Sequence, residues 1–356
     1  MVNENQRYYE LFNKLKSERP DHSKLTANSN VLIVDGLNTF IRTWCAIPTQ
    51  NEHGDHIGGT TGFLTSVGYA IRQFKPTRVI IAFDGKDGSA SRKKIYSEYK
   101  ANRGKNRLSR VNRVYGQLSD NEERRQMKRQ LQITAKILSR LPVSLMLYPR
   151  VEADDVIGYV SRKLCKERSI IMSSDKDFLQ LVDDETTVWS PTKKKLYTKE
   201  SLYEEYGIPN ENFLLFRMID GDASDNIGGI KGIALKTLIK RFPIITGGKI
   251  SMTDLLEYAQ EQVDGGSKIK VYSTLLESAD ILKRNKKLMN LEKTLISGAL
   301  KLKIVDNFNS HIPELNRLEL QKKLIKEGMI DAMPSLPTWI QSTFKTLDRY
   351  AHESNG

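Results

Sequence analysis

Residues 31–37 read VLIVDGL, a run of large and β-branched apolar side chains that ends in an aspartate and a glycine. A run this short and this apolar is typical of a strand that is buried on both faces. The same pattern returns in residues 78–84 (RVIIAFD), 143–148 (VSLMLY) and 169–173 (SIIMS). These runs predict the strands of a mainly parallel sheet.

The segments between these runs have the longer periodicity of helices. They span residues 62–74, 121–141 and 153–166. Strands that alternate with helices predict right-handed βαβ crossovers and a doubly wound α/β fold. Ligands of such folds bind at the carboxyl ends of the strands.

The chain is expected to divide into a core and two flanking parts. Residues 1–29 should form an N-terminal extension with one helix, and residues 30–190 the α/β core. Beyond Pro191 the strand signals fade, and short helices are expected around a Gly-rich turn, so residues 191–356 should form a helical C-terminal region.

Charge and composition restrict the class of protein. The 356 residues contain 56 Lys and Arg against 43 Asp and Glu, a formal net charge of +13. This excess favours a polyanionic partner, above all nucleic acid, although charge alone does not separate DNA, RNA and an acidic membrane surface. No apolar run approaches the roughly 18 residues of a membrane span, and no signal peptide opens the chain, so a cytoplasmic location is expected. Cys45 and Cys165 are expected to be buried free thiols, and the histidines to be exposed.

Acidic residues follow the strand runs with unusual regularity. Asp35 and Asp84 end the first two runs; Glu152, Asp154 and Asp155 follow the third, and Asp175 and Asp177 the fourth. Taken singly, each could cap a helix or stabilise a turn. Together they would repel one another at one sheet edge unless a cation neutralised them. Oxygen ligands without clustered His or Cys favour Mg²⁺ or Mn²⁺.

A second acidic pair lies in the sequence DGDASDN of the helical region. The DxxD spacing of Asp222 and Asp225 places both carboxylates on one face of a helical turn. This pair would complete a second metal site, and two ions about 4 Å apart suit phosphodiester hydrolysis.

Residues 86–130 form a basic segment. Between Arg92 and Arg129 there are 13 Lys and Arg against four acids, with tyrosines among the cations in RKKIYSEYKANRGK. On a helix these side chains would share one face that grips phosphate while an aromatic ring stacks on a base. A solvated charged face is an equally good interpretation. The residues of this expected face are Arg92, Tyr96, Tyr99, Lys100 and Arg103.

Residues 226–233 (NIGGIKGI) match a helix-hairpin-helix turn. Glycines in such a turn let backbone N–H groups approach a phosphate, and Lys231 and Lys236 would add charge. A Gly-rich connection can also be a plain turn, but its place directly after Asp222 and Asp225 makes it more informative.

Together the motifs VLIVDGLN, IIAFDG, YSEYKANRGK, VEADDVIG, SSDKDFLQL and DGDASDNIGGIKGI resemble the flap endonuclease and 5′-3′ exonuclease family over residues 31–242. The phage replication 5′ nucleases of the phage RNase H type are the most similar members, because VWSPTKKKLYTK and RNKKLMNLE follow. The resemblance implies a PIN-like nuclease core with a helical arch over residues 86–130 and a helix-hairpin-helix turn.

The resemblance also assigns roles to residues. It implies a first metal ion on Asp35, Asp84, Glu152 and Asp154, and a second among Asp155, Asp175, Asp177, Asp222 and Asp225. Arg92 and Lys100 would be the catalytic cations that steady the scissile phosphate, and Tyr99 would stack near the 5′ end. Further contacts to nucleic acid would come from Tyr96, Lys93, Arg103, Gly229, Lys231, Gly232 and Lys236, with a K⁺ ion at the turn. Two departures stand there, because the family often has Pro at Gly228 and Gly at Ala234.

The function implied is a 5′-3′ exonuclease and flap endonuclease that removes RNA primers and 5′ flaps during DNA replication, leaving 5′-phosphate and 3′-hydroxyl ends. Expected partners are branched or flapped DNA, RNA–DNA hybrid, and a single-strand-binding protein or sliding clamp; the chain should be a monomer, in the host cytoplasm if phage-encoded. Two alternatives stay open: a catalytically inactive, structure-specific DNA-binding protein, and a PIN-type ribonuclease.

Overall fold

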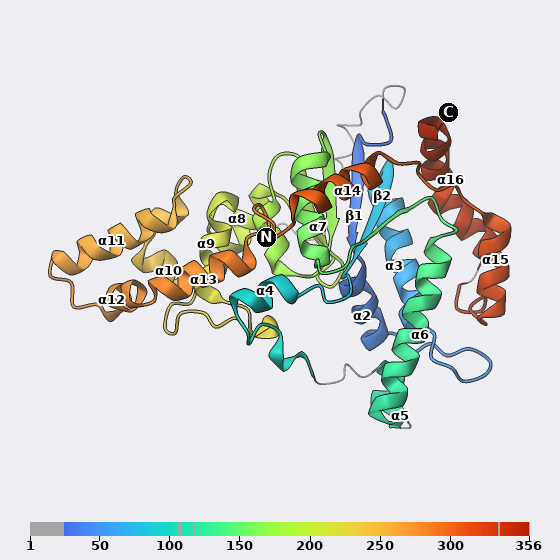
Figure 1. The fold of residues 1–356 in the computed structure, drawn as a ribbon, viewed down its shortest axis with the longest axis horizontal. Helices are drawn as coiled ribbons and strands as arrows, with labels where there is room; N and C mark the ends of the chain where they lie inside the picture. The colour runs from blue at the N-terminus through green and yellow to red at the C-terminus, as the bar shows by residue number, and fades with distance from the viewer. Residues whose placement is uncertain (1–24, 105–108, 117, 334, 356) are drawn as a thin grey trace, which may run out of the picture.

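A six-stranded sheet forms the centre of the fold (Figure 1). The structure, a computed structural model, describes residues 25–104, 109–116, 118–333 and 335–355. The strand order is β3-β2-β1-β4-β5-β6; β1 to β5 are parallel, and β6 is antiparallel to β5. The strands are β1 (Asn30–Asp35), β2 (Arg78–Phe83), β3 (Ser144–Leu147), β4 (Arg168–Met172), β5 (Thr186–Ser190) and β6 (Lys195–Tyr197). The predicted mainly parallel, doubly wound sheet is confirmed.

The sequence interpretation missed the last two strands. β5 reads TTVWS and β6 only KLY, inside a lysine-rich stretch, so neither has a long apolar run. The expectation that strands end before Pro191 was therefore wrong for β6. Pairing of β5 with β4 and of β6 with β5, rather than local hydrophobicity, makes these residues extended.

Alternate residues of the strands enter two separate hydrophobic cores. Val31 and Ile33 of β1 belong to one core, and Leu32 and Val34 to the other, all at most 1% exposed. Each fully buried side chain of this kind contributes about 1.5–3 kcal/mol. The burial of both faces explains why the strand shows a continuous apolar run and no alternation.

Helices from distant parts of the chain cover the two faces (Figure 1). One core includes side chains of α7 (Ala153–Tyr159), the π-turn Val160–Leu164 and α14 (Gly298–Asn309). The other includes side chains of α2 (Gly36–Ala46), α3 (Gly58–Phe74), α6 (Asp120–Leu138), α15 (Arg317–Lys326) and α16 (Leu336–Asn355). The last two helices therefore complete a face that the first half of the chain begins.

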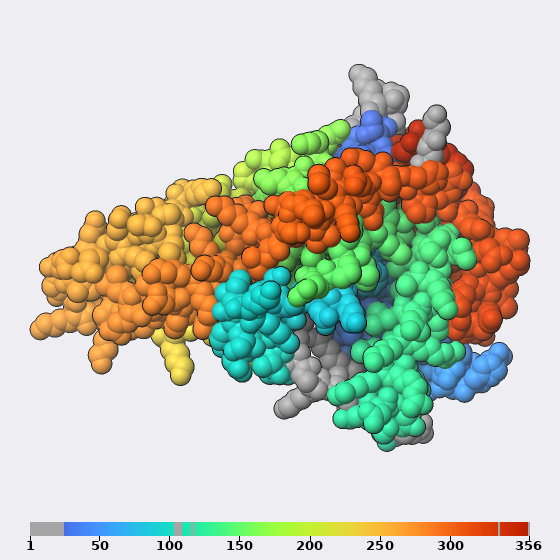
Figure 2. All heavy atoms as spheres, viewed as in Figure 1, coloured from blue at the N-terminus to red at the C-terminus, as the bar shows by residue number. Residues whose placement is uncertain are grey.

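The helices between β6 and α14 continue the first core away from the sheet. They are α8 (Lys199–Tyr206), α9 (Phe213–Asp220), α10 (Leu235–Arg241), α11 (Met252–Asp264), α12 (Lys270–Glu277) and α13 (Ala279–Met289). In Figures 1 and 2 they form an arm, in yellow and orange, that extends to one side of the sheet. Phe213, Phe242 and Tyr272 fill its interior.

The basic segment contains short helices, not the one helical face that its spacing suggested. α4 (Ala90–Ile95) ends because Tyr96 is extended, and Lys100 has a left-handed φ of 58°. A 3₁₀ turn (Ala101–Gly104) and α5 (Arg110–Tyr115) follow. The expectation of a single continuous helical face over residues 92–103 was wrong, because the helix breaks at Tyr96 and again at Lys100. The breaks bring Arg92, Tyr99 and Lys100 together at Glu152 instead.

Three further expectations concerned the N-terminal helix, the histidines and the two cysteines. The helix expected within residues 1–29 lies largely outside the described residues, of which 25–29 include a turn closed by Ser29 N–H donating to Thr26 O. His56 is buried instead of exposed: it packs 4.6 Å from Trp44 between ring centroids and bonds to Ile47 O. Cys45 and Cys165 are free as expected, but half-buried.

Within the described ranges, none of the helices is both long and apolar enough to cross a bilayer.

Candidate metal centre

The sheet topology brings the strand-end carboxylates to one edge. Asp35 is the last residue of β1 and Asp84 directly follows β2, and these neighbouring strands are in register with Asp35 opposite Ala82. The chain order reverses between β1 and β4, which is where doubly wound sheets open a crevice for ligands.

Each of these two carboxylates accepts a hydrogen bond from the first turn of a helix. Asp35 accepts a hydrogen bond from Asn38 N at 3.0 Å and one from Ser173 Oγ at 2.9 Å. Asp84 accepts from Ala153 N at 2.8 Å, which fixes the start of α7. The capping interpretation was therefore correct for Asp35, the N-cap of α2, whereas Asp84 bonds to the start of α7, whose N-cap is Glu152. These hydrogen bonds explain how the chain aims each carboxylate.

The loops after β3 and β4 supply the next acids. Glu152 is the N-cap of α7, and Asp154 and Asp155 lie in its first turn. Asp175 is the N-cap of the 3₁₀ helix Lys176–Leu181 and accepts from Asp177 N at 2.9 Å. Helix N-termini favour negative charge, so the fold tolerates acids here more easily than elsewhere.

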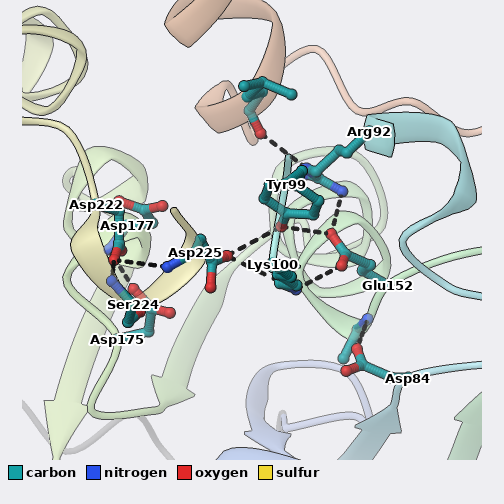
Figure 3. Close-up of polar contacts among 12 residues, drawn as sticks. Asp84, Arg92, Tyr99, Lys100, Glu152, Asp175, Asp177, Asp222, Ser224 and Asp225 are labelled. Carbon is teal, nitrogen blue, oxygen red and sulfur yellow. Dashed lines mark hydrogen bonds and ion pairs between the residues drawn. The ribbon is translucent and has the colours of Figure 1, made fainter. Parts of the chain in front are cut away.

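Asp222 is the N-cap and Asp225 the last residue of a single 3₁₀ turn, Ala223–Asp225, and neither lies on an α-helix. Asp222 accepts from Ser224 N at 2.7 Å and from Asp225 N at 3.3 Å. Within the described part of the chain, Asp175, Asp177 and Asp222 form a group whose carboxylate oxygens all lie within 4.8 Å of one another (Figure 3). That spacing fits three ligands of one hard cation.

The electrostatics of the cluster also fit a bound cation. Burial raises the pKa of Asp35 to about 7, and the negative charges of Asp84 and Asp175 add to this effect. Burial likewise raises the pKa of Asp175 to about 7, with Asp177, Asp222 and Asp225 as charged neighbours.

Two more acids of the cluster show the same shift. Burial raises the pKa of Asp154, and Asp35 and Asp175 raise it further. Burial also raises the pKa of Asp177, although Arg217 opposes this rise. Carboxylates held together against their own repulsion are typical of a site for a divalent ion.

Glu152 differs because cations surround it (Figure 3). Arg92 NH1 lies 2.6 Å from Glu152 Oε2 and 2.6 Å from Asp155 Oδ2. Lys100 Nζ lies 2.5 Å from Glu152 Oε1 and 3.7 Å from Asp225 Oδ2. Burial acts to raise the pKa of Glu152, but Arg92 and Lys100 outweigh it and hold that pKa below its ordinary value.

The residues expected to contact nucleic acid differ in how far they are exposed. Arg92 and Tyr99 are 3% and 2% exposed, and the Tyr99 hydroxyl donates to Glu152 and Asp225 at 3.0 Å each, so neither offers a free surface to a phosphate or base here. Tyr96 is half-buried under the guanidinium of Arg284, 4.5 Å from its ring centroid, and Lys93 is exposed. Only the backbone of Arg103 is described, in the 3₁₀ turn.

The glycine turn packs tightly against the end of α9. Ile230 N donates to Ile219 O at 2.7 Å, and a Cβ at Gly229 would meet Asp220 O at 2.2 Å. Gly232 has a φ of 85°, and it is exposed together with Lys231 and Lys236. The turn joins the basic segment through Lys100 N, which donates to Asp225 O at 2.8 Å.

Two residues at this site were missed in the sequence. Arg217 of α9 is 4% exposed and pairs with Asp177, Asp220 and Asp222 at 2.7–3.1 Å. Asn285 of α13 is fully buried and donates to Met218 O and to Gly228 O. The available signals were a lone arginine in the apolar run FLLFRMID and the asparagine of RNKKLMNLE.

Comparisons with known proteins identify the family of the chain. The family model for the 5′-3′ exonuclease N-terminal resolvase-like domain matches residues 30–207. The 5′-3′ exonuclease of Buchnera aphidicola subsp. Acyrthosiphon pisum is 31% identical over 221 residues, which are 60% of this chain and 71% of that protein. DNA polymerase I of Bacillus subtilis is 29% identical over 276 residues, 75% of this chain and 28% of that protein.

Among solved structures, the D15 flap endonuclease of bacteriophage T5, crystallised with DNA and metal ions, has a similar fold. Its TM-score is 0.59 at 19% identity, over 85% of this chain and 100% of that one. The matched residues 30–207 include the strand-end carboxylates from Asp35 to Asp177. The chain therefore belongs to the 5′-3′ exonuclease family and is a metal-dependent 5′ nuclease, a phosphodiesterase.

Proposed function

We propose that this nuclease uses Mg²⁺ to remove RNA primers and 5′ flaps from DNA during replication, leaving 5′-phosphate and 3′-hydroxyl ends. The observation that carries the proposal is the continuity of the acidic edge with the glycine turn: Asp222 and Asp225 lead directly into Asn226–Ile233. A site for cleavage and a site for duplex backbone thus adjoin. Mn²⁺ is expected to substitute, because both ions prefer oxygen ligands.

The ligands divide into two groups in this proposal. Asp35, Asp84, Glu152 and Asp154 would hold one ion, and Asp155, Asp175, Asp177, Asp222 and Asp225 would surround the other. When bound, a pair of ions activates water and neutralises charge on the leaving oxygen. The hydrogen bonds that Asp35, Asp84 and Asp175 accept from backbone N–H groups orient these carboxylates before any ion binds.

Lys100 and Arg92 have different parts in the proposal. Lys100 is 11% exposed at the edge of the cluster and carries a charge that could turn from Glu152 toward a phosphate. Arg92 is enclosed, with Nε donating to Leu288 O at 2.8 Å, so it acts by holding Glu152 and Asp155 in place. Tyr99, bonded to Glu152 and Asp225, would become a stacking surface only after a rearrangement of the segment.

The proposed path of the nucleic acid runs from the glycine turn to the basic segment. Exposed Lys231 and Lys236, with the backbone of Gly229 and Gly232, would follow the duplex, and carbonyl groups there would take K⁺. A free 5′ strand would pass the residue 86–130 segment, where Lys93, Tyr96 and Arg103 would meet it. The substrates in this proposal are flapped DNA and RNA–DNA hybrid.

The cellular setting is proposed on the same basis. A monomeric enzyme in the cytoplasm, that of the host if the chain is phage-encoded, would meet a single-strand-binding protein or a sliding clamp at the replication fork. Residues beyond 246 offer the surface for such contacts.

The test is Mg²⁺-dependent cleavage of a 5′-labelled flap duplex beside a matched single strand, with wild type and Asp175→Asn. Flap-selective cleavage that falls at least about 100-fold in the variant supports the proposal. Tight flap binding without cleavage by either protein would instead indicate an inactive DNA-binding protein, and preferential cleavage of structured RNA a PIN-type ribonuclease.

A further inference from the structure

Arg217 is a positive charge built into the metal centre. Its Nε lies 2.7 Å from Asp177 Oδ1, its NH2 3.1 Å from Asp222 Oδ2, and its NH1 3.0 Å from Asp220 Oδ2. Asp177 and Asp222 are two of the three carboxylates that approach within 4.8 Å of one another, with Asp175 beside them (Figure 3). The guanidinium therefore shares ligands with the candidate ion.

The position of Arg217 in the fold keeps it there. Its neighbours Phe216 and Met218 are buried in the core of the arm, and Asn285 donates to Met218 O at 2.8 Å. Lys100, by comparison, sits in a turn after a broken helix. A guanidinium does not lose its proton in a protein, so the charge of Arg217 is permanent.

The cation has two opposite effects on a divalent ion. It fixes two carboxylates with directed hydrogen bonds, which prepares the ligands. It also repels a second cation that approaches the same oxygens. Both oxygens of Asp222 are already used, since Oδ1 accepts from Ser224 N and Asp225 N. Repulsion should exceed preparation, because the capping bonds already orient Asp175 and Asp222 without Arg217.

We propose that Arg217 lowers the affinity for a divalent ion between Asp177 and Asp222, while it holds both carboxylates in place when no ion is bound. The inference rests on the proposed metal role of these two residues. Among the described residues, Asp35, Asp84 and Asp154 on the β1 side form no ion pair, and only Glu152 there is paired, with Arg92 and Lys100. On the other side the acids are nearly all paired: Asp177 and Asp222 with Arg217, Asp155 with Arg92 and Asp225 with Lys100. The two sides should therefore bind divalent ions with unequal affinity, the β1 side first.

A cavity beside the metal centre suggests how the weaker site, between Asp177 and Asp222, would bind its ion. Arg217, Asp220 and Asp222 line a cavity of about 530 Å³, together with Asn38, Ser174 and Lys176. A phosphate in this cavity would face both Arg217 and the weakly held ion, and its negative charge would offset their repulsion. Substrate would then complete the loading of the centre.

The experiment titrates the metal-free full chain with Mn²⁺ and follows free Mn²⁺ by electron paramagnetic resonance. Wild type should show a tight and a weak class of sites. In Arg217→Met the weak class should tighten on the order of tenfold or more, because a unit charge a few ångströms from the ion is removed. Arg217→Lys, which keeps the charge, should stay near wild type.

Arg78→Met is the matched control. Arg78 is also buried, but its hydrogen bonds go to Asn28, Phe308 and Ser144. None of these partners is an acid of the metal centre. Arg78→Met should lower the melting temperature without changing either class of sites. In Arg217→Met, by contrast, Mn²⁺ should raise the melting temperature more than it does in wild type.

Equal or weaker Mn²⁺ binding by Arg217→Met would overturn the inference and leave Arg217 a merely structural residue. If that variant fails to fold, Arg217→Gln takes its place with the same expectation. If neither wild type nor Asp175→Asn bound Mn²⁺, the proposed metal role itself would be rejected. That result differs from unchanged Mn²⁺ binding in Arg217→Met, so the failure of the proposed function and the failure of this inference are distinguishable.

Discussion

At the residue scale, each strand-end carboxylate combines a local and a collective property. Asp175 accepts from Asp177 N as an ordinary helix cap, yet its pKa is raised to about 7 by burial and by the acids around it. The cap directs the carboxylate, and the collective repulsion makes its charged form costly without a cation. Removal of that charge should therefore act oppositely on stability and on activity.

Asp175→Asn is expected to stabilise the metal-free protein while abolishing cleavage. The asparagine keeps an acceptor for Asp177 N and removes one negative charge. Because the carboxyl pKa is raised from 3.8 to about 7, its penalty is absent below about pH 4 and complete above pH 7. At about 1.4 kcal/mol for each unit by which the pKa is raised, the gain should be on the order of 4 kcal/mol at pH 8 and vanish toward pH 4. Thermal unfolding in chelator across this range checks it; a loss of stability at pH 8 would contradict it.

His56 should make stability depend on pH with the opposite sign. Burial lowers the pKa of His56 below its ordinary 6.5, so the folded protein binds its proton less readily than the unfolded chain. Stability from the neutral ring is complete above pH 6.5 and is lost as the pH falls through and below that value. The melting-temperature advantage of wild type over His56→Gln should shrink between pH 8 and pH 5.5. A difference independent of pH would show that packing against Trp44 alone matters.

At the element scale, the glycine turn depends on one close approach more than on glycine content. A Cβ at Gly229 would meet Asp220 O at 2.2 Å, whereas at Gly228 nothing lies within 4 Å. The turn must stay against α9 because Ile230 N bonds to Ile219 O and Asp222 N to Ile227 O.

Gly229→Ala is expected to cost about 2 kcal/mol or more and to weaken binding of a flap duplex, because the backbone of α9 or of the turn must move. Gly228→Ala is the matched control and should stay within about 0.5 kcal/mol of wild type. Thermal unfolding and a fluorescence anisotropy titration with labelled flap DNA measure both effects. Equal behaviour of the two variants would mean that the turn adjusts without cost.

At the scale of the whole molecule, the sheet is closed by the end of the chain. Leu320 and Leu324 of α15, and Ile340, Phe344 and Leu347 of α16, lie in the same core as Leu32 and Val34 of β1. The segment that the family model covers, residues 30–207, thus supplies only part of the cover on this face, through α2, α3 and α6.

Leu324→Ala should therefore destabilise the nuclease core itself, by about 2–5 kcal/mol, since its side chain is fully buried. Ile325→Ala, its neighbour at 60% exposure, should change stability by less than about 0.5 kcal/mol. Deletion of residues 311–356 should abolish cooperative unfolding. Denaturant titrations of these three variants measure their free energies of unfolding. A deletion variant with wild-type stability would show that the sheet does not need α15 and α16.

The sequence by itself determined the strands β1 to β4, the place of the acids at their ends and the family. Local information suffices for these features, because a strand buried on both faces must be apolar throughout and a capping acid stands next to its helix. In the basic segment, local information gave a wrong prediction. The 3.6-residue spacing predicted one helical face there, but it carries no information about the break at Tyr96.

Only the tertiary structure decided which distant charges meet. Arg217 in FLLFRMID reads like any polar position of a helix, until α9 packs beside the loop after β4 and places it between Asp177 and Asp222. β5 is a strand beside β4 and β6 a strand beside β5, and α15 and α16 pack on a sheet whose strands are far from them in the sequence. Such contacts depend on side chains tens to hundreds of residues apart, and no local periodicity records them.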